Sequence, residues 1–380
     1  MKNAIKSNKI LSQIGFGFTG AAFTGALSLC VCAVTNRGLL SFLLCCILCF
    51  AFSVKSKESI FAPHSFLLVP LFFAMSQGSE LATGLTIFGG GLIYLLMSKL
   101  MKSRRLPDFV ISGAGLGLAV GATILLTNSY FGIGANSFTP FDMLKEFRSL
   151  GFHPNFRGLF YGTITLFAMI TFPFKFKKLN KYLPAAFVTL LIPYAFNLFL
   201  NPQRELTTIN EALSLALRES LRAEFTSYMS ISAKDIPLIL KGSVGFGVIL
   251  YIFGNDGISV APANCLSGIL SGIPVKKHPI KSYGVISAVT SAVIITLWVF
   301  LCPSAFSRLP LHCAGSMLIV FAWQSLPTAS LKSVFKERNF IKILLMLLCA
   351  VPFVLTDVFA STLVCIIVWA IFGNRKELTK

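Results

Sequence analysis

The sequence predicts an all-α polytopic membrane protein of about 13–14 transmembrane segments, arranged as an inverted repeat of seven plus seven. Three observations support this fold class. Of the 380 residues, 55% are hydrophobic and only 12% are charged, against roughly 25% charged in an ordinary soluble domain. Apolar runs of about 20 residues, the length that spans a bilayer as a helix, recur along the whole chain. The connectors between the runs alternate between basic and nearly neutral.

A polar stretch at 201–235 separates the apolar runs into two sets. The first set lies at about 14–35, 38–54, 61–76, 81–98, 109–128, 158–174 and 183–200. The second lies at about 236–254, 258–273, 280–302, 310–325, 341–355 and 357–373. The run at 280–302 is also compatible with two short helices, so the second set holds six or seven segments. Lysines ahead of the first run are compatible with a signal peptide, but the long run without a small-residue cleavage site favours a retained helix.

The connectors predict the topology. Six of them are basic and together carry +17 of the formal net charge of +19. They are 1–13, 55–58, 99–105, 175–181, 332–342 and 375–380. The connectors 129–157 and 201–235 are nearly neutral. By the positive-inside rule the basic connectors and both termini are cytoplasmic. Because loop topology accounts for the basic composition, we expect no nucleic-acid partner.

Two halves with odd numbers of spans have opposite orientations, which is the inverted-repeat plan of many secondary transporters. We therefore expect a first repeat at 1–200, an extracytoplasmic amphipathic linker at 201–235, a second repeat at 236–373 and a cytoplasmic tail at 374–380. The expected location is the plasma membrane, which is the inner membrane if the source is bacterial.

Several motifs have structural interpretations here. Gly15–Gly20 matches GxGxxG, but it opens a membrane helix rather than following a strand, which argues against a dinucleotide site. Gly113, Gly117 and Gly121 have the spacing that lets helices approach closely in lipid. Cys46-Ile-Leu-Cys49 lacks a second ligand pair, and the chain contains no HExxH or GxxxxGK[ST] motif. We therefore expect no metal, no cofactor and no enzymatic activity.

Two interrupted segments indicate a binding site. Pro63-His64-Ser65 stands at the start of the short third run, where proline favours a helix beginning. A helix that begins at membrane depth directs free N–H groups and partial positive charge into the protein, which suits an anion. In the second half, Gly272-Ile273-Pro274 and Pro279 interrupt the pattern before Ile280-Lys281-Ser282. That stretch is either a second broken helix beginning, with a cation, or an ordinary basic loop.

These segments resemble a known family. Ala263-Asn264 and Gly268–Pro274 resemble the ANxxSGxxGGIP stretch of the SulP family of sulfate permeases and related anion exchangers. Leu309–Trp323 resembles that family's IPxAALAGILIVVAW run. Phe109–Gly132 resembles its fifth helix, and Asp357 fits a late apolar pair. The resemblance covers most of 15–373 in order, and it is weakest in the first half.

The resemblance implies seven plus seven spans divided into a core and a gate domain. In the family, two half-helices of the third and tenth spans direct their N-termini at a central anion. The positions implied as substrate-binding here are Phe23, Leu27, Pro63, His64, Ser65, Phe66, Ile280, Lys281 and Ser282. Lys281 stands where the family often has arginine, and lysine lacks the bidentate fork of arginine.

The chain also departs from the family pattern. The stretch from Lys281 to Pro303 is about nine residues shorter than the resemblance implies, so the second repeat is shortened. The stretch 242–254 contains no carboxylate, although many relatives carry one there that is linked to ion coupling. We expect the membrane domain alone, without the family's C-terminal STAS domain.

The function that this interpretation favours is secondary transport of a small anion by alternating access, without covalent chemistry. Sulfate, bicarbonate, chloride and dicarboxylates all remain candidates. One alternative is a nucleobase carrier of the same seven-plus-seven plan, although it would need a carboxylate in 242–254. The other is a degenerate, non-transporting membrane scaffold. The expected partners are the anion and the lipid bilayer, with a possible homodimer.

Overall fold

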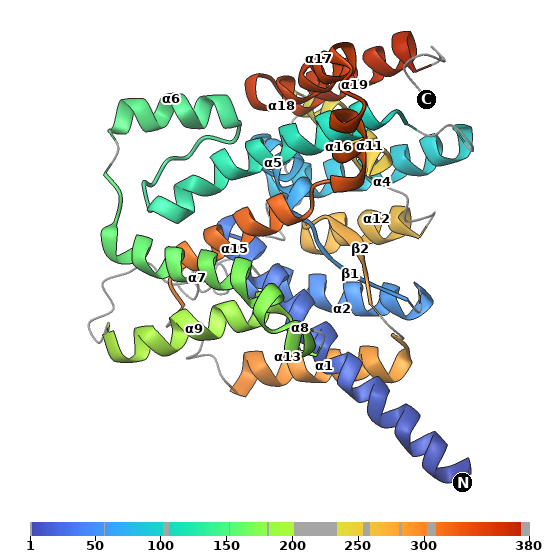
Figure 1. Ribbon diagram of the computed structural model, residues 1–380, viewed down its shortest axis with the longest axis vertical. Coiled ribbons are helices and arrows are strands. Elements are labelled where there is room, and N and C mark those ends of the chain that lie inside the picture. The colour runs from blue at the N-terminus through green and yellow to red at the C-terminus, as the bar shows by residue number, and fades with distance from the viewer. Residues whose placement is uncertain are drawn as a thin grey trace.

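The computed structural model is mainly helical (Figure 1) and includes one small two-stranded sheet. It describes residues 2–56, 58–101, 106–151, 153–180, 182–200, 234–253, 259–280, 283–301 and 309–373. Most of the predicted linker at 201–235, and the tail at 374–380, therefore lie outside the described residues.

Eleven elements precede the linker. They are α1 (Lys2–Val34), α2 (Leu39–Ser56), β1 (Ser59–Pro63), η1 (Ser65–Leu67), α3 (Leu68–Met75), α4 (Glu80–Leu100), α5 (Asp108–Phe131), α6 (Pro140–Leu150), α7 (Phe156–Lys175), α8 (Lys177–Asn180) and α9 (Ala185–Leu200). The predicted third span is thus a strand followed by a short helix. It is the only one of the seven predicted first-half runs that the described residues do not form as a single helix.

The second group of elements is shorter. It comprises α11 (Ile236–Ile252), α12 (Val260–Ser271), β2 (Val275–Pro279), α13 (Val285–Leu301), α15 (Leu311–Gln324), α16 (Thr328–Lys336), α17 (Phe340–Ala350), α18 (Pro352–Leu355) and α19 (Val358–Phe372). Among the described residues, five helices are long and apolar enough to cross a membrane: α1, α2, α4, α5 and α7. Eight further apolar helical stretches have only 10–17 residues. Six of these eight lie from α11 onwards, so none of the five long helices belongs to the second group of elements.

Helix contacts repeat between the two halves. In the first group of elements α4 packs against α11 and α12, and in the second α13 packs against α1 and α2. A separate set joins α5 with α15 and α17, and α7 with α15 and α9. The core domain consists of α1, α2, α4, α11, α12 and α13 with β1, β2, η1 and α3. The gate domain consists of α5, α7, α8, α9, α15, α17 and α19. The same neighbour relations in both halves are those of the predicted seven-plus-seven inverted repeat, with β2 in the place of the tenth span.

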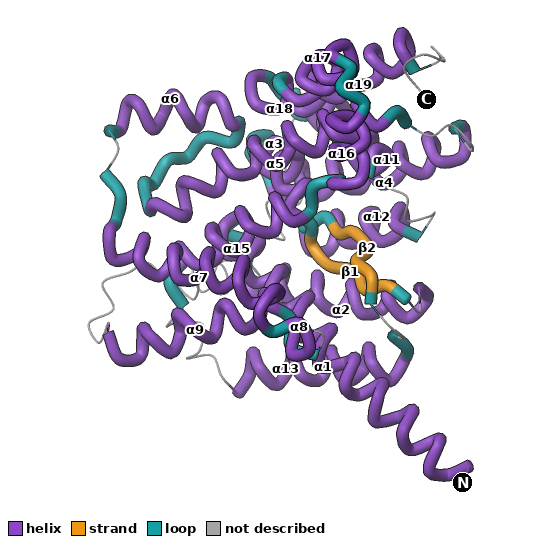
Figure 2. Tube along the Cα trace, viewed as in Figure 1, coloured by secondary structure: helices purple, strands orange, loops and turns teal. Residues whose placement is uncertain are grey.

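The two broken segments meet in the sheet at the middle of the molecule (Figure 2). β1 pairs with β2 in antiparallel orientation, with Ile60 opposite His278 and Pro63 opposite Val275. On the other edge of β1, the backbone groups of Phe61 form hydrogen bonds with side chains of α1 and α2. Phe61 N donates to Ser53 Oγ at 2.8 Å, and Thr24 Oγ1 donates to Phe61 O at 3.1 Å. These bonds matter because lipid offers no water to satisfy a strand's free edge.

The structure corrects the prediction for the tenth span. Residues 275–279 form a strand rather than a basic loop, and Ile280 lies outside any helix. A single helix, α13, then starts at Val285. No half-helix begins at Ile280, and the run 280–302 does not form two short helices within its described part. The physical reason is length. The strand takes up Val275–Pro279, and the residues that remain before Pro303 suffice for only one spanning helix, α13.

The small-residue packing predicted for the fifth span is confirmed. A Cβ added at Gly113 or Gly117 would lie 2.4 Å from the Met346 or Ala350 carbonyl oxygen of α17. The GxGxxG glycines of α1 have a similar role. Gly17 lies against Thr290 of α13, and Gly20 lies against the Tyr283 ring just before that helix. These glycines allow helices to approach at backbone distance.

Candidate functional site

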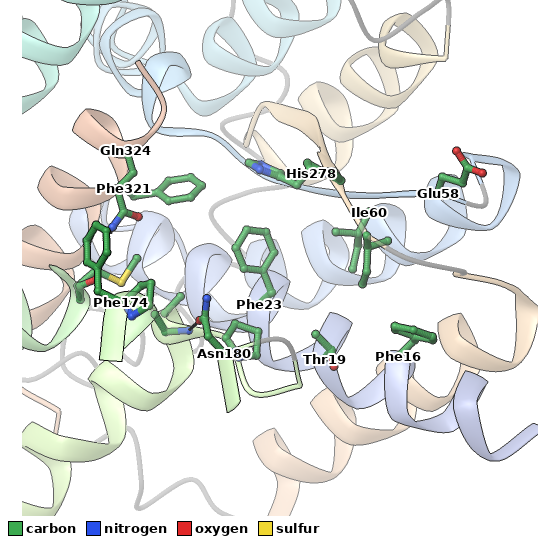
Figure 3. Close-up of a pocket in the computed structure, with 17 residues that line it drawn as sticks. Phe16, Thr19, Phe23, Glu58, Ile60, Phe174, Asn180, His278, Phe321 and Gln324 are labelled. Carbon is green, nitrogen blue, oxygen red and sulfur yellow. Dashed lines mark hydrogen bonds between the residues drawn. The ribbon is translucent and has the colours of Figure 1, made fainter. Parts of the chain in front are cut away.

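A cavity of about 1030 Å³ lies between the core and the gate domains (Figure 3). The core lines it with α1, the start of β1 and the end of β2, and the gate lines it with α7, α8, α9 and α15. The lining side chains with polar groups are Thr19, Glu58, Asn180, His278 and Gln324, and the aromatic ones are Phe16, Phe23, Phe174 and Phe321. Glu58 and Asn180 belong to basic connectors, so the cavity extends from that side of the protein to the sheet.

The helix that follows β1 begins with a histidine cap. His64 has extended backbone angles, φ −127° and ψ 136°, and its Nδ1 accepts a hydrogen bond from Phe66 N at 3.2 Å. The next residue, Ser65, donates through Oγ to Leu318 O of the gate at 3.4 Å. The break between β1 and η1 therefore lies at the contact between the two domains.

Four rings form a cluster around this break, which we call the aromatic cluster: Phe23, His64, His278 and Phe321. His64 and His278 stack at a centroid distance of 5.2 Å and an interplanar angle of 19°. Phe23 meets His278 edge-on at 5.1 Å, and Phe321 lies 5.6 Å from it. Figure 3 shows Phe23, His278 and Phe321 entering the cavity from α1, β2 and α15. The cluster thus combines residues of the core and the gate.

The positive charge near the cluster comes from β2. Side chains alternate along a strand, so Lys276 and His278 share one face and Lys277 takes the other. Lys276 Nζ lies 5.7 Å from the Phe253 ring centroid and lines a small cavity with His64 and Phe66. Lys277 Nζ lies over Phe61 on the opposite face, at 5.8 Å.

The stretch Ala263–Pro274 holds β2 in place. Asn264 Nδ2 donates to Val275 O at 2.8 Å, and Val275 N donates to Asn264 Oδ1 at 2.9 Å. Gly272 ends α12 with φ 62°, a left-handed conformation that suits glycine. Ser267 Oγ also donates to Ile273 O. The residues that carry the family resemblance therefore fix the turn that presents Lys276 and His278.

The predicted site residues divide into three groups. Phe23 and Ile280 line the large cavity, and His64 and Phe66 line the small one. Pro63 and Ser65 lie at the break, and Leu27 lies one helical turn after Phe23. All three are buried and line neither cavity. Lys281 and Ser282 lie outside the described residues.

Sequence reasoning did not place His278, Lys276 or Phe321 in the site. The available signal was the spacing of Lys276 and His278, which stand two residues apart and therefore share one face if the segment is a strand. Phe321 lies in the apolar stretch 317–323, so its place in the cluster depends on helix packing that the sequence does not indicate.

Metal chemistry finds no support in the described part of the chain. It holds no group of three or more His, Cys, Asp or Glu side chains placed to bind a metal ion. The nine cysteines described there are free, and all but Cys265 are buried.

Comparison with known proteins shows a similarity of fold. Neither protein-family models nor curated protein sequences give a match to this sequence. Among solved structures, SLC26A9 aligns with 97% of this chain at a TM-score of 0.66 and 10% identity. The transmembrane domain of the cyanobacterial bicarbonate transporter BicA aligns with 94% of this chain and 97% of its own, at a TM-score of 0.60 and 15% identity.

A structure of the murine Solute Carrier 26 family member A9 anion transporter in the inward-facing state aligns with 96% of this chain and 68% of its own, at a TM-score of 0.61 and 9% identity. The chain spans 66% of the SLC26A9 chain first compared, just under two thirds. This chain is therefore a multi-pass membrane protein with the fold of these transmembrane domains.

Proposed function

We propose that this chain is a secondary transporter of a small anion, related to the SulP family, that works by alternating access between its core and gate domains. The basic connectors and both termini face the cytoplasm, and the membrane is the plasma membrane. The transport cycle needs no covalent step. The anion or a coupled ion supplies the driving force.

The observation that carries this proposal is the cavity of about 1030 Å³ between core and gate, which reaches Phe23, His278 and Phe321 of the aromatic cluster. A site shared by two domains is one that a relative movement of the domains can open to either side. The likeness in fold to BicA and SLC26A9, which are named a bicarbonate transporter and an anion transporter, supports the proposal.

The charges near the cavity favour an anion. Lys276 stands beside His64 at the start of η1, where backbone N–H groups add partial positive charge. Among the described residues that line the cavity, the only carboxylate is Glu58, which precedes β1 at the far end from the aromatic cluster. A cation at the cluster would stand near the like charge of Lys276.

Uptake into proteoliposomes tests the proposal. Radiolabelled sulfate, bicarbonate, chloride and a dicarboxylate are compared for the wild type, Lys276→Gln and Lys336→Gln. Saturable uptake of at least one anion is expected. Lys276→Gln raises the KM for that anion about tenfold, because a nearby charge contributes on the order of 1.4 kcal/mol. Lys336 is exposed on α16, so its neutralisation leaves KM unchanged. Absence of uptake of every anion by folded wild-type protein would contradict the proposal.

One observation favours a second candidate, a membrane scaffold that does not transport. Among the described residues, the strand β2 stands where the tenth span is expected, and no helix starts at Ile280, where the resemblance implies the second anion-binding helix start. The same assay separates the candidates, because a scaffold gives no uptake above empty liposomes.

A further inference from the structure

The walls of the large cavity are mainly apolar. Its volume of about 1030 Å³ matches the upper end of the range, roughly 300–1,000 Å³, of pockets that bind organic ligands among hydrophobic side chains. The large apolar side chains come from both domains: Phe16, Phe23 and Ile280 from the core, and Met169, Phe174 and Phe321 from the gate. These side chains offer an inorganic anion no hydrogen bond in exchange for its water.

Three of the polar side chains that line the cavity bond the backbone of the protein itself. Thr19 Oγ1 donates to Tyr182 O at 2.8 Å. Asn180 Oδ1 accepts from Ala185 N at 2.8 Å, and Gln324 Nε2 donates to a carbonyl of α7 at 3.4 Å. A strongly hydrated anion such as sulfate needs many donors to replace its water, because burial of a poorly paired charge is costly. The cavity therefore favours a ligand with little polar surface.

The charged groups at the cavity lie at its two ends. Glu58 lines the mouth, and the described lining residues include no lysine or arginine. At the deep end His278 stacks on His64, and Lys276 lines the small cavity together with His64. One anionic group is therefore attracted to the deep end. A second anionic group on the same ligand would lie among the apolar walls or towards Glu58, where no basic side chain of the described lining pairs with it.

Between these ends α1 provides a continuous wall. Phe16, Thr19 and Phe23 are spaced three and four residues apart, so they share one face of the helix (Figure 3). Seven residues of helix rise about 10 Å. An apolar body of that length fits along α1 from Phe23 towards the mouth, between this wall and the side chains of α7 and α15.

We propose that the substrate is a monovalent organic anion, with one carboxylate or sulfonate group on an apolar body. This inference rests on the proposed function and names its substrate class. The anionic group lies at the aromatic cluster, beside His278, and the body lies along α1 towards Phe16. Each methylene group that the cavity buries then raises the affinity about threefold to fourfold.

Uptake of radiolabelled alkanesulfonates into proteoliposomes tests the proposal, with chloride and sulfate measured alongside. Sulfonates stay ionised, so they do not cross the bilayer as neutral acids. Along methanesulfonate, butanesulfonate and hexanesulfonate, KM should fall by about threefold for each added methylene group. Butane-1,4-disulfonate carries the body of butanesulfonate with a second charge. It and sulfate should each compete with labelled butanesulfonate at least about tenfold less well than unlabelled butanesulfonate does.

Variants of the cavity wall locate the apolar body. Phe16→Ala and Phe174→Ala should raise KM for hexanesulfonate by about threefold to tenfold, because each removes part of the wall, and should leave KM for methanesulfonate nearly unchanged. The matched controls are Phe18→Ala on α1 and Phe167→Ala on α7. Both control phenylalanines are exposed and neither lines the cavity, so these variants should behave as wild type towards the whole series.

Three results would overturn the proposal. KM values that do not change along the series would show that the apolar walls do not hold the substrate. Equal competition by the monosulfonate and the disulfonate would show that the site does not select one charge. Equal effects of the wall variants and their controls would place the body elsewhere. Uptake of an inorganic anion without uptake of any alkanesulfonate overturns only this inference, whereas no uptake of any anion by folded wild-type protein overturns the proposed function as well.

Discussion

Asn264 is the single residue on which the position of β2 depends most directly. Its fully buried amide bonds both the N–H and the carbonyl of Val275, the first residue of the strand. The strand in turn presents Lys276 and His278 to the break in the third span. One side chain on α12 thereby sets the depth at which two functional candidates lie.

Asn264→Ala should destabilise the protein by about 3 kcal/mol, because it leaves two buried backbone groups of Val275 without partners. The measurement is the thermal unfolding of the purified protein in detergent, followed by intrinsic fluorescence. The control is Asn136→Ala, whose side chain is exposed in a loop and whose loss should leave the transition unchanged. Equal transitions for both variants would show that the amide does not hold the strand.

At the scale of elements, α5 and α17 approach each other at backbone distance. At Gly113 and Gly117 an added Cβ would meet the carbonyl oxygens of α17 at 2.4 Å, well inside contact distance. Both helices belong to the gate, which must move as a unit if the core moves against it. The glycine stripe therefore serves the rigidity of one domain rather than the site.

Gly117→Ala should lower stability by about 1–3 kcal/mol, because the methyl group forces α5 and α17 apart. Gly15→Ala is the matched control. It is also a helical glycine, but no atom lies within 4 Å of its added Cβ. Alanine there should be neutral, or stabilising by up to about 1 kcal/mol through helix propensity. The readout is again the unfolding temperature in detergent. If Gly117→Ala melted with or above Gly15→Ala, the packing interpretation would be wrong.

The elements also show what sequence reasoning can and cannot reach. Hydropathy and connector charge predicted the spans and the two halves, because a bilayer imposes helix length and loop charge directly. The residues 274–281 predict either a basic loop or, after Pro279, a helix beginning at Ile280, because their lysines and histidine resemble solvent-exposed sequence. The identity of Val275–Pro279 as a strand depends on pairing with Ser59–Pro63, more than two hundred residues earlier in the chain. Such a distant pairing cannot be deduced from local pattern.

Near the site, the sequence predicted where the third span breaks, because a proline interrupts the apolar run there. Pro63 and His64 mark the start of η1, and both lie at the contact between core and gate. Lys281 lies outside the described residues, so its place in the site stays a prediction. Within the described part of the chain, a charge beside His64 comes from Lys276, on the strand before it.

On the scale of the whole molecule, core and gate meet differently at the two ends of the cavity. On the side of the basic connectors the cavity separates them. Beyond the break, η1 and α3 of the core contact α5 of the gate, and η1 also contacts α15. Here Val69 of α3 lies 3.3 Å from where a Cβ at Gly121 of α5 would stand. Alternating access requires this contact to part while the cavity side closes.

A disulfide across this contact tests the central claim most directly. The atom 3.3 Å from the added Cβ of Gly121 is Val69 Cγ2, and a cysteine Sγ stands at the same position along the side chain, so cysteines at Val69 and Gly121 are within reach of a disulfide. Oxidised Val69→Cys/Gly121→Cys protein should lose anion uptake into proteoliposomes, because the core can no longer move against the gate. A reductant should restore uptake, and each single variant should transport under both conditions. Full uptake by protein shown to be cross-linked would contradict transport by relative movement of the two domains.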